Sequence, residues 1–364
     1  MRFFDHQLDA RVRTRRLRLA FLLAVVGTVA GMHLALAVPF VLVRALYGVP
    51  AEVIYPRGFL WVNIATPLML ILGGWWIESS NTRHGVRLAE RLGARPAQPG
   101  SRLAEQRLAN IVQEMSIAAH MPLPTVLVLP REMSINAFAS GMEPADWAVT
   151  VTEGALEYLK RDELMGLVAH ELSHLREGDT ALNMRLIGMV FGLEMVWGFG
   201  QSMCTAEDEH GCDRVPVSAI IGVIIMAVGW CGWLAGRALQ AAVSREREYL
   251  ADARAVQWTR QADGLGCTLR KCLGQQQTGV QLRLPQHHAF SHLLLAEGEG
   301  EEDGGSGRQW LATHPPLAER IRRIYGGTRG ALDARPLEDG GDTPRPDVSD
   351  NPFRSSRPLS PPTY

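Results

Sequence analysis

The sequence is poor in cysteine, and none of its five cysteines stands in a C-x-x-C pair. This absence excludes a zinc ribbon, a thioredoxin-type redox site and a disulfide-dense secreted scaffold. An excess of charge of one sign is absent too, because the formal net charge is −1. We therefore expect no nucleic-acid partner. The chain does have a strongly uneven distribution of charge, because long uncharged runs alternate with charged stretches.

The first uncharged run covers 19–43 and follows a cluster of arginines between Arg11 and Arg18. Its length is enough to cross the ~30 Å hydrocarbon core of a bilayer, and it exceeds the apolar core of a signal peptide. A second run, 59–77, carries tryptophans near its ends, where membrane helices meet the interface. The connecting segment is short, so we interpret the two runs as a transmembrane hairpin.

Arginines flank this hairpin on both sides, between Arg11 and Arg18 and again between Arg83 and Arg102. The positive-inside rule then places both ends of the hairpin in the cytoplasm. The alternative is a buried helical hairpin in a soluble protein, which fits the run lengths and the arginine flanks less well.

Residues 101–180 have the composition of a soluble domain. Apolar residues recur at helical spacing over 101–119, and a second helix is expected to begin near Asp162 and to end at Gly178. Three stretches between these helices are typical of strands: 125–129, 135–140 and 147–152.

The second of these helices contains the motif His170-Glu171-Leu-Ser-His174. Positions i and i+4 lie on one helix face, so both imidazoles can point at one ion. Glu171 stands beside that face and is the candidate general base for an attacking water. The alternative is a helix with two surface histidines and an ordinary glutamate; the apolar neighbours that anchor the motif in a helix count against it.

A catalytic zinc needs a third protein ligand. Glu248 and Asp252 are also four residues apart and share a helix face. One of these carboxylates can bind the metal while the other orients a ligand histidine through its free N–H. Alone, such a pair of acidic residues usually lies on a solvated charged helix face. It indicates a metal site here only because the histidine motif is also present.

The position of the third ligand also bears on membrane topology. Because His170 and Glu248 must reach the same ion, the chain between them crosses the membrane an even number of times. The run 217–234 is uncharged and typical of a membrane helix, whereas 186–200 is shorter and contains Glu194. We therefore predict that both cross, at about 182–203 and 217–238, which gives four spans with the zinc at the cytoplasmic face.

The loop between these two spans contains Cys204 and Cys212. They either form a disulfide, if the loop lies in an oxidising compartment, or remain two unpaired thiols.

With these residues in place, the sequence resembles the HtpX-like and CAAX-prenyl-protease-like membrane zinc metallopeptidases. The resemblance covers roughly residues 15–326 and is far more specific than any single motif. The matching segments, in order, are Ile135-Asn136-Ala-Phe-Ala-Ser-Gly141, His170-Glu-Leu-Ser-His174 continuing to Gly178-Asp179, Ser244-Arg-Glu-Arg-Glu248-Tyr-Leu-Ala-Asp252, and Thr313-His314-Pro-Pro with Arg320 downstream.

The resemblance implies a gluzincin-type core. With the four predicted spans, the expected fold is a predominantly α membrane protein with four transmembrane helices and a mixed α+β zinc protease domain with a small edge sheet. The resemblance also implies one Zn²⁺ held by His170, His174 and Glu248, with Glu171 as general base. It further implies that Asn136, on or beside an edge strand, binds the substrate backbone, as strand edges can do. The alternative for Asn136 is a turn residue that caps the strand.

The remaining site residues have two interpretations each. His314 either donates a hydrogen bond to the oxyanion of the reaction or begins a helix. Arg320 either contacts substrate or ties the C-terminal helix to the core. Asp179, like Asp252, is expected to orient the site; a helix cap is its alternative.

The leading functional hypothesis is an integral membrane endopeptidase of the bacterial inner membrane, embedded in the lipid bilayer, which cleaves membrane or misfolded proteins at the cytoplasmic face. A CAAX-type processing protease has more spans, and a zinc-stabilised scaffold has no use for Glu171. A protease that cuts inside the membrane would carry its motif in an apolar span, whereas charged residues at 160–163 and 176–177 bracket this one.

The expected division of the chain follows: a basic cytoplasmic N-terminus (1–18), a transmembrane hairpin (19–77), the first part of the protease domain (78–180), a second hairpin (181–239), the second part of the protease domain (240–328) and a disordered tail (329–364). The Gly- and Glu-rich stretch 297–307 is expected to be a solvated loop.

Overall fold

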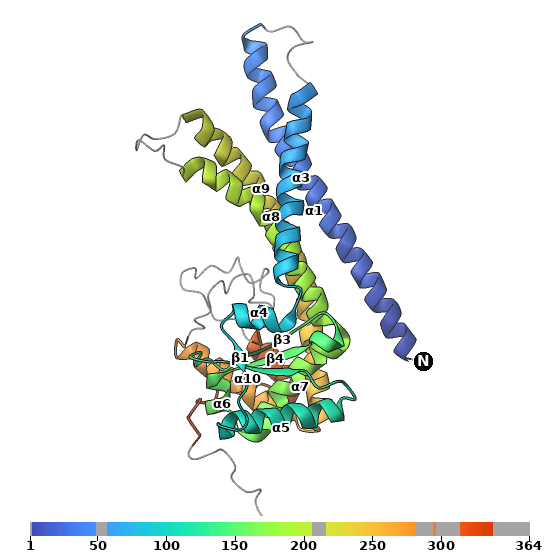
Figure 1. Cartoon of the computed structure of the whole chain (residues 1–364), viewed down its shortest axis with the longest axis vertical. Coiled ribbons are helices and arrows are strands. Elements are labelled where there is room, and N and C mark those ends of the chain that lie inside the picture. The colour runs from blue at the N-terminus through green and yellow to red at the C-terminus, as the bar shows by residue number, and fades with distance from the viewer. Residues whose placement is uncertain (1, 49–56, 206–215, 281–293, 296–313, 338–364) are drawn as a thin grey trace, which may run out of the picture.

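The computed structural model describes residues 2–48, 57–205, 216–280, 294–295 and 314–337. Within these residues the chain is mostly helical and contains one four-stranded sheet. Long helices extend away from a domain that is built around the sheet (Figure 1). The expected loop at 297–307, Cys212 and most of the expected tail lie outside the described residues.

Four long helices account for the apolar runs of the sequence: α1 (Arg2–Leu46), α3 (Arg57–Asn81), α8 (Asp179–Thr205) and α9 (Pro216–Thr259). Each contains a segment that is long and apolar enough to cross a membrane: Leu19–Leu46, Gly58–Asn81, Asp179–Cys204 and Ala219–Ala241. The predicted fold class, with four such helices and a small mixed sheet, is confirmed.

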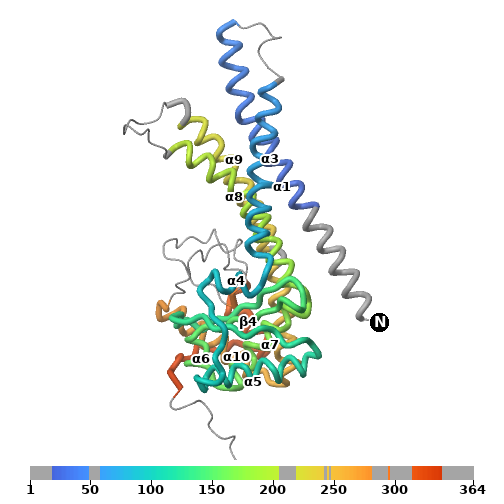
Figure 2. Tube along the Cα trace, in the orientation of Figure 1, coloured from blue at the N-terminus to red at the C-terminus, as the bar shows by residue number. Residues whose placement is uncertain are grey.

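Helices α3, α8 and α9 leave the sheet domain close together, and farther from the domain the long helices separate into two pairs, α1 with α3 and α8 with α9 (Figures 1 and 2). Glycine permits the close approach of α8 to both neighbours. A Cβ at Gly200 would lie 2.5 Å from the backbone N of Met226 in α9, and one at Gly192 would lie 2.5 Å from the carbonyl O of Ile71 in α3. Small residues at such contacts are typical of helices that pack in a membrane.

The sheet has the strand order β1-β2-β4-β3. Its strands are β1 (Arg95–Pro96), β2 (Thr125–Leu129), β3 (Ala137–Ser140) and β4 (Ala148–Thr152). β2 pairs with β4 in parallel, and the other two pairs are antiparallel. β3 is therefore an edge strand. The three expected strands are confirmed to within two residues, whereas β1 is too short to leave a periodic pattern.

Alternate strand residues face two apolar clusters on opposite sides of the sheet. Val128 and Ala139 contribute to the larger cluster, together with α5 (Leu103–Ala118), α7 (Arg161–Glu177) and α10 (Ala262–Gln277). Leu127 and Phe138 face the smaller cluster, with α4 (Gly85–Arg91) and the first turns of α8. The remaining short helices are η1 (Pro144–Asp146), α6 (Glu153–Tyr158) and α12 (Leu317–Tyr325).

Helix α9 continues from its apolar segment into the sheet domain without a break. The expected boundary between the second hairpin (181–239) and the second part of the protease domain (240–328) falls inside this helix, because no proline interrupts the chain between Pro216 and Thr259. Glu248 follows Ala241, the end of the apolar segment, by seven residues, or about 10 Å of helix. The helix thus places Glu248 close to the membrane end of the domain.

Candidate metal centre

Helix α7 is fixed at both ends, and this fixes its histidines. At its start the Glu163 carboxylate accepts a hydrogen bond from the backbone N–H of Lys160 at 2.8 Å and pairs with the Lys271 ammonium of α10 at 2.7 Å. At its end Gly178 adopts a left-handed conformation with φ 73°, which favours glycine. Apolar residues between these ends, including Leu164, Leu167 and Val168, are fully buried.

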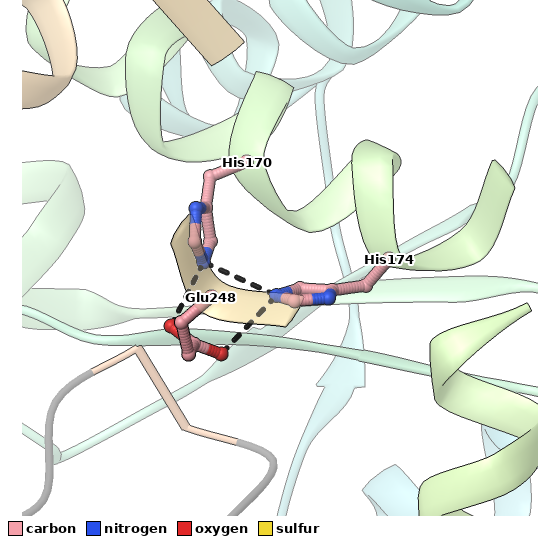
Figure 3. Close-up of side chains that lie close together, drawn as sticks. All are labelled: His170, His174 and Glu248. Atoms are coloured by element: carbon pink, nitrogen blue, oxygen red, sulfur yellow. Dashed lines mark hydrogen bonds and ion pairs between the residues drawn. The ribbon is translucent and has the colours of Figure 1, made fainter. Parts of the chain in front are cut away.

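His170 and His174 of α7 converge with Glu248 of α9 (Figure 3). The two Nε2 atoms are 3.2 Å apart. Glu248 Oε2 lies 3.6 Å from His170 Nε2, and Glu248 Oε1 lies 3.4 Å from His174 Nε2. Among the described residues, this is the group of histidines and acids whose ligand atoms are close enough to hold a metal ion.

The spacing of the two Nε2 atoms and the Glu248 oxygens fits a divalent metal such as zinc. Bonds of 2.0–2.1 Å in tetrahedral geometry place ligand atoms about 3.3 Å apart, close to the distances observed between the Nε2 atoms and the Glu248 oxygens. Two imidazole nitrogens and a carboxylate also form one of the common donor sets of catalytic zinc.

The other ring nitrogen of each histidine faces a carboxylate. His170 Nδ1 lies 3.1 Å from Asp252 Oδ1, and His174 Nδ1 lies 3.1 Å from Asp179 Oδ2. A carboxylate in this position holds the proton on Nδ1 and leaves the Nε2 lone pair for a metal. Both Nε2 atoms are thereby directed at the same point.

Arg320 of α12 is fully buried beside the centre. Its guanidinium donates two hydrogen bonds to Asp252, at 2.7 and 2.9 Å, and Nη1 lies 3.1 Å from Glu248 Oε2. Burial alone would lower the pKa of Arg320, but Asp252 and Glu248 raise it above its ordinary value. The buried guanidinium is therefore a fixed cation that balances two carboxylates.

Glu248 remains ionised in these surroundings. Burial acts to raise the pKa of its carboxyl group, but His314 and Arg320, followed by His170 and His174, hold it well below its usual range. His314 Nδ1 lies 3.3 Å from Glu248 Oε2. Position 314 thus brings a third imidazole to the centre, just before α12 begins.

Glu171 is buried in α7 between the two histidines in sequence. Burial raises the pKa of its carboxyl group, and the adjacent His170 and His174 act in the opposite direction. Both histidines, Glu248 and His314 are close enough to influence its charge. The candidate general base is therefore part of the same buried group.

Asn136 lies at the start of the edge strand and is buried. Its Oδ1 accepts hydrogen bonds from the backbone N–H groups of Ala137, at 3.0 Å, and Leu295, at 2.8 Å. The structure therefore brings all nine predicted site residues to this region: the histidine pair, six residues around it, and Asn136 through Leu295, whose carbonyl accepts a hydrogen bond from Arg320.

Sequence reasoning misses two groups at the centre. Arg247 pairs with Asp179, although nothing in the spacing of its segment separates it from Arg245, another arginine of the same motif. Leu295 lies in a stretch without a chemical signature, and its hydrogen bonds with Asn136 and Arg320 are made by the backbone.

Comparisons with known proteins identify the family of the chain. The sequence model of peptidase family M48 matches residues 102–327. A protease HtpX homolog from Thermoanaerobacter pseudethanolicus is 34% identical over 267 residues, covering 71% of this chain and 82% of that protein. One from Streptococcus gordonii is 30% identical over 303 residues, covering 79% and 94%. The crystal structure of S. mikatae Ste24p has a TM-score of 0.41 at 16% identity and covers 88% of this chain and 66% of its own.

Four membrane-type helices that carry a sheet domain with this cluster define a class, the membrane metalloproteases. The family model covers more than half of the sequence, and the chain belongs to peptidase family M48. It is accordingly a multi-pass membrane protein and a peptide hydrolase.

Proposed function

We propose that the chain is a zinc-dependent endopeptidase that cleaves membrane or misfolded proteins at the cytoplasmic face of the membrane. The observation that carries the proposal is the convergence of His170 Nε2, His174 Nε2 and the Glu248 carboxylate beside the buried Glu171. HtpX homologues among bacterial proteins support the choice of a bacterial inner membrane.

His170, His174 and Glu248 would hold one zinc ion. When bound, zinc supplies a Lewis acid that polarises a carbonyl and lowers the pKa of water. Glu171 takes the proton from the attacking water and delivers it to the leaving amine. Asp252 and Asp179 keep the two imidazoles in the orientation that binding requires.

The positions of His314 and Arg320 support one role for each. The burial of His314 and its distance of 3.3 Å from Glu248 support a role as hydrogen-bond donor to the oxyanion that forms as water attacks. The paired hydrogen bonds from Arg320 to Asp252 support the interpretation that Arg320 ties α12 to the core. The same guanidinium also reaches a backbone carbonyl, that of Leu295.

The cytoplasmic position is supported by the arginines that flank the first hairpin. The distance of about 10 Å along α9 between the end of the apolar segment and Glu248 supports a site near the membrane surface. A site this close to the bilayer suits segments that emerge from the membrane, and clearing misassembled membrane proteins is the role that we propose.

The test compares zinc content and casein cleavage in three forms of the detergent-purified protein: wild type, Glu171→Gln and His174→Ala. Glu171→Gln keeps its ligands, so we expect about one zinc per chain and a loss of activity of at least roughly 10²-fold. His174→Ala removes a ligand, so we expect both zinc and activity to be lost.

Two results would contradict the proposal. Full activity of Glu171→Gln would show that Glu171 is not the general base. Normal zinc binding by Glu248→Ala, measured in the same series, would show that the third ligand lies elsewhere.

A further inference from the structure

The edge strand β3 has backbone groups that β4 does not use. Asn136 faces Thr152, whose backbone N–H donates to the Asn136 carbonyl at 3.1 Å. In antiparallel pairing, residues whose backbone N–H and C=O groups point to the partner strand alternate with residues whose backbone groups point away from it. The amide groups of Ala137 and Ala139 therefore point to the outer edge, on the side away from β4.

One residue of the chain already uses this outer edge. The backbone N–H of Leu295 donates to the Ala137 carbonyl at 3.2 Å and to Asn136 Oδ1 at 2.8 Å. The Leu295 carbonyl accepts a hydrogen bond from Arg320 Nη1 at 2.9 Å. The N–H and the C=O of Leu295 are thus both hydrogen-bonded to groups beside the metal centre.

These contacts are the kind that an extended peptide makes when it adds to a sheet edge. The side chains agree, because Leu294 is buried in the cluster on the α4 face of the sheet and Leu295 in the cluster on the α7 face. Consecutive side chains that point to opposite sides are the mark of an extended backbone. Leu294 and Leu295 therefore lie against β3 as a short added strand would.

The same position is next to the catalytic groups. Arg320 Nη1, which holds the Leu295 carbonyl, is 3.1 Å from Glu248 Oε2, and Arg320 Nη2 is 3.4 Å from His170 Nε2. The Arg320 guanidinium would therefore contact both the backbone of a peptide bound here and the metal ligands.

We propose that Asn136, the Ala137 carbonyl and Arg320 form a site for one residue of an extended substrate peptide, and that Leu295 occupies this site in the resting protein. The ligand class is a peptide with a large apolar side chain at this position, because the Leu295 side chain is buried in an apolar cluster. A substrate must displace Leu295, so the chain inhibits itself. This inference rests on the proposed function.

The first test measures hydrogen exchange at the Leu295 amide in the zinc-loaded Glu171→Gln protein, with and without an excess of a casein-derived peptide that the wild type cleaves. Displacement exposes the Leu295 amide, so its exchange should become faster when the peptide binds. Unchanged or slower exchange would show that Leu295 is a fixed wall of the site and would overturn the inference. Failure of the wild type to cleave any peptide would instead count against the proposed function.

The second test uses Leu295→Pro, which removes the N–H and keeps an apolar side chain. If Leu295 competes with substrate, losing its hydrogen bond should lower KM for the same peptide about fivefold and leave kcat and zinc content unchanged. A higher or unchanged KM with zinc retained would overturn the inference.

Leu337→Pro is the matched control. The Leu337 N–H donates to the Glu157 carbonyl at 3.0 Å, away from the metal centre, so the same substitution should leave KM unchanged. Should Leu295→Pro fail to fold, the exchange measurement on Glu171→Gln decides the matter without it.

Discussion

Each histidine of the metal-ligand cluster turns one ring nitrogen toward the cluster and the other toward a carboxylate. For His174 that carboxylate is Asp179, which also pairs with Arg247. The second contact matters because Asp179 opens helix α8, and Arg247 holds it from α9. The orientation of this ligand of α7 therefore depends on two other helices, α8 and α9.

At this scale we expect Asp179→Asn to weaken zinc binding by about 10–100-fold, because the amide no longer holds the Nδ1 proton as a carboxylate does. Competition with a zinc chelator measures the affinity. Asp333→Asn is the control, since Asp333 and its partner Arg335 are both exposed. Equal affinity of Asp179→Asn and wild type would show that Asp179 only caps α8.

At the scale of elements, α7 lies in close contact with α10. A Cβ at Gly166 would lie 2.3 Å from the backbone N of Leu265 and 2.7 Å from the carbonyl C of Gly264. Backbone cannot move aside as a flexible side chain does. The position of α7, and so of its two histidines, depends on the absence of a side chain at position 166.

We expect Gly166→Ala to lower the free energy of unfolding by about 1–3 kcal/mol, as overpacking does in other cores. Thermal unfolding of the detergent-purified protein measures the change. Gly73→Ala is the matched control, because a Cβ at this helical glycine would meet nothing within 4 Å. A midpoint for Gly166→Ala equal to that of the control would contradict the close packing of α7 on α10.

A second element contact should respond to pH. The buried Glu105 of α5 accepts two hydrogen bonds from Arg95 of β1, at 2.6 and 3.0 Å, and one from the backbone N–H of Gln98. The hydrogen bonds from Arg95 hold the pKa of Glu105 below its ordinary value of 4.5, although burial opposes them.

The pKa of Glu105 is lower in the folded protein than in the unfolded chain. The contact therefore stabilises the fold fully at pH values above the pKa of the unfolded chain, and this stabilisation is lost as pH falls through the pKa of the folded protein. We expect Glu105→Gln to unfold at a lower temperature than wild type at pH 7. The gap should narrow below about pH 4.5, near the ordinary pKa of a glutamate. A gap that is constant from pH 7 to pH 4 would show that the charge of Glu105 contributes nothing.

At the scale of the whole molecule, two antiparallel helices bring the halves of the site together. Helix α8 leaves the domain at Asp179, directly after the histidine helix, and α9 returns to it with Glu248. His170 and Glu248 can meet because the chain between them goes out and comes back. The meeting of these residues supports four spans, with both ends of each hairpin on one side.

The proposed cytoplasmic side is tested with single cysteines in a cysteine-free background, labelled in intact cells by a membrane-impermeant maleimide. We expect a cysteine in place of Glu209, in the loop between the last two spans, to react. One in place of Gln106, on an exposed part of α5, should react only after the cells are opened. The reverse pattern would place the metal centre outside the cytoplasm.

The sequence alone determined the elements whose signal is local. Apolar runs long enough for a bilayer predicted three of the membrane helices, and the need for an even number of crossings predicted the fourth. Short apolar runs bounded by prolines or a turn predicted three of the four strands. The i, i+4 spacing of His170 and His174 predicted the metal ligands of α7, because neighbouring turns of one helix are fixed by backbone geometry.

Only the tertiary structure decided which groups from distant segments meet. It brought Arg320 to Asp252 and Glu248, Arg247 to Asp179, and the Leu295 backbone to Asn136. These contacts join residues separated by many tens of positions, and a backbone amide gives no sequence signal at all. Their physical cause is the packing of α9 and α12 on α7 and the edge strand, which no local pattern encodes.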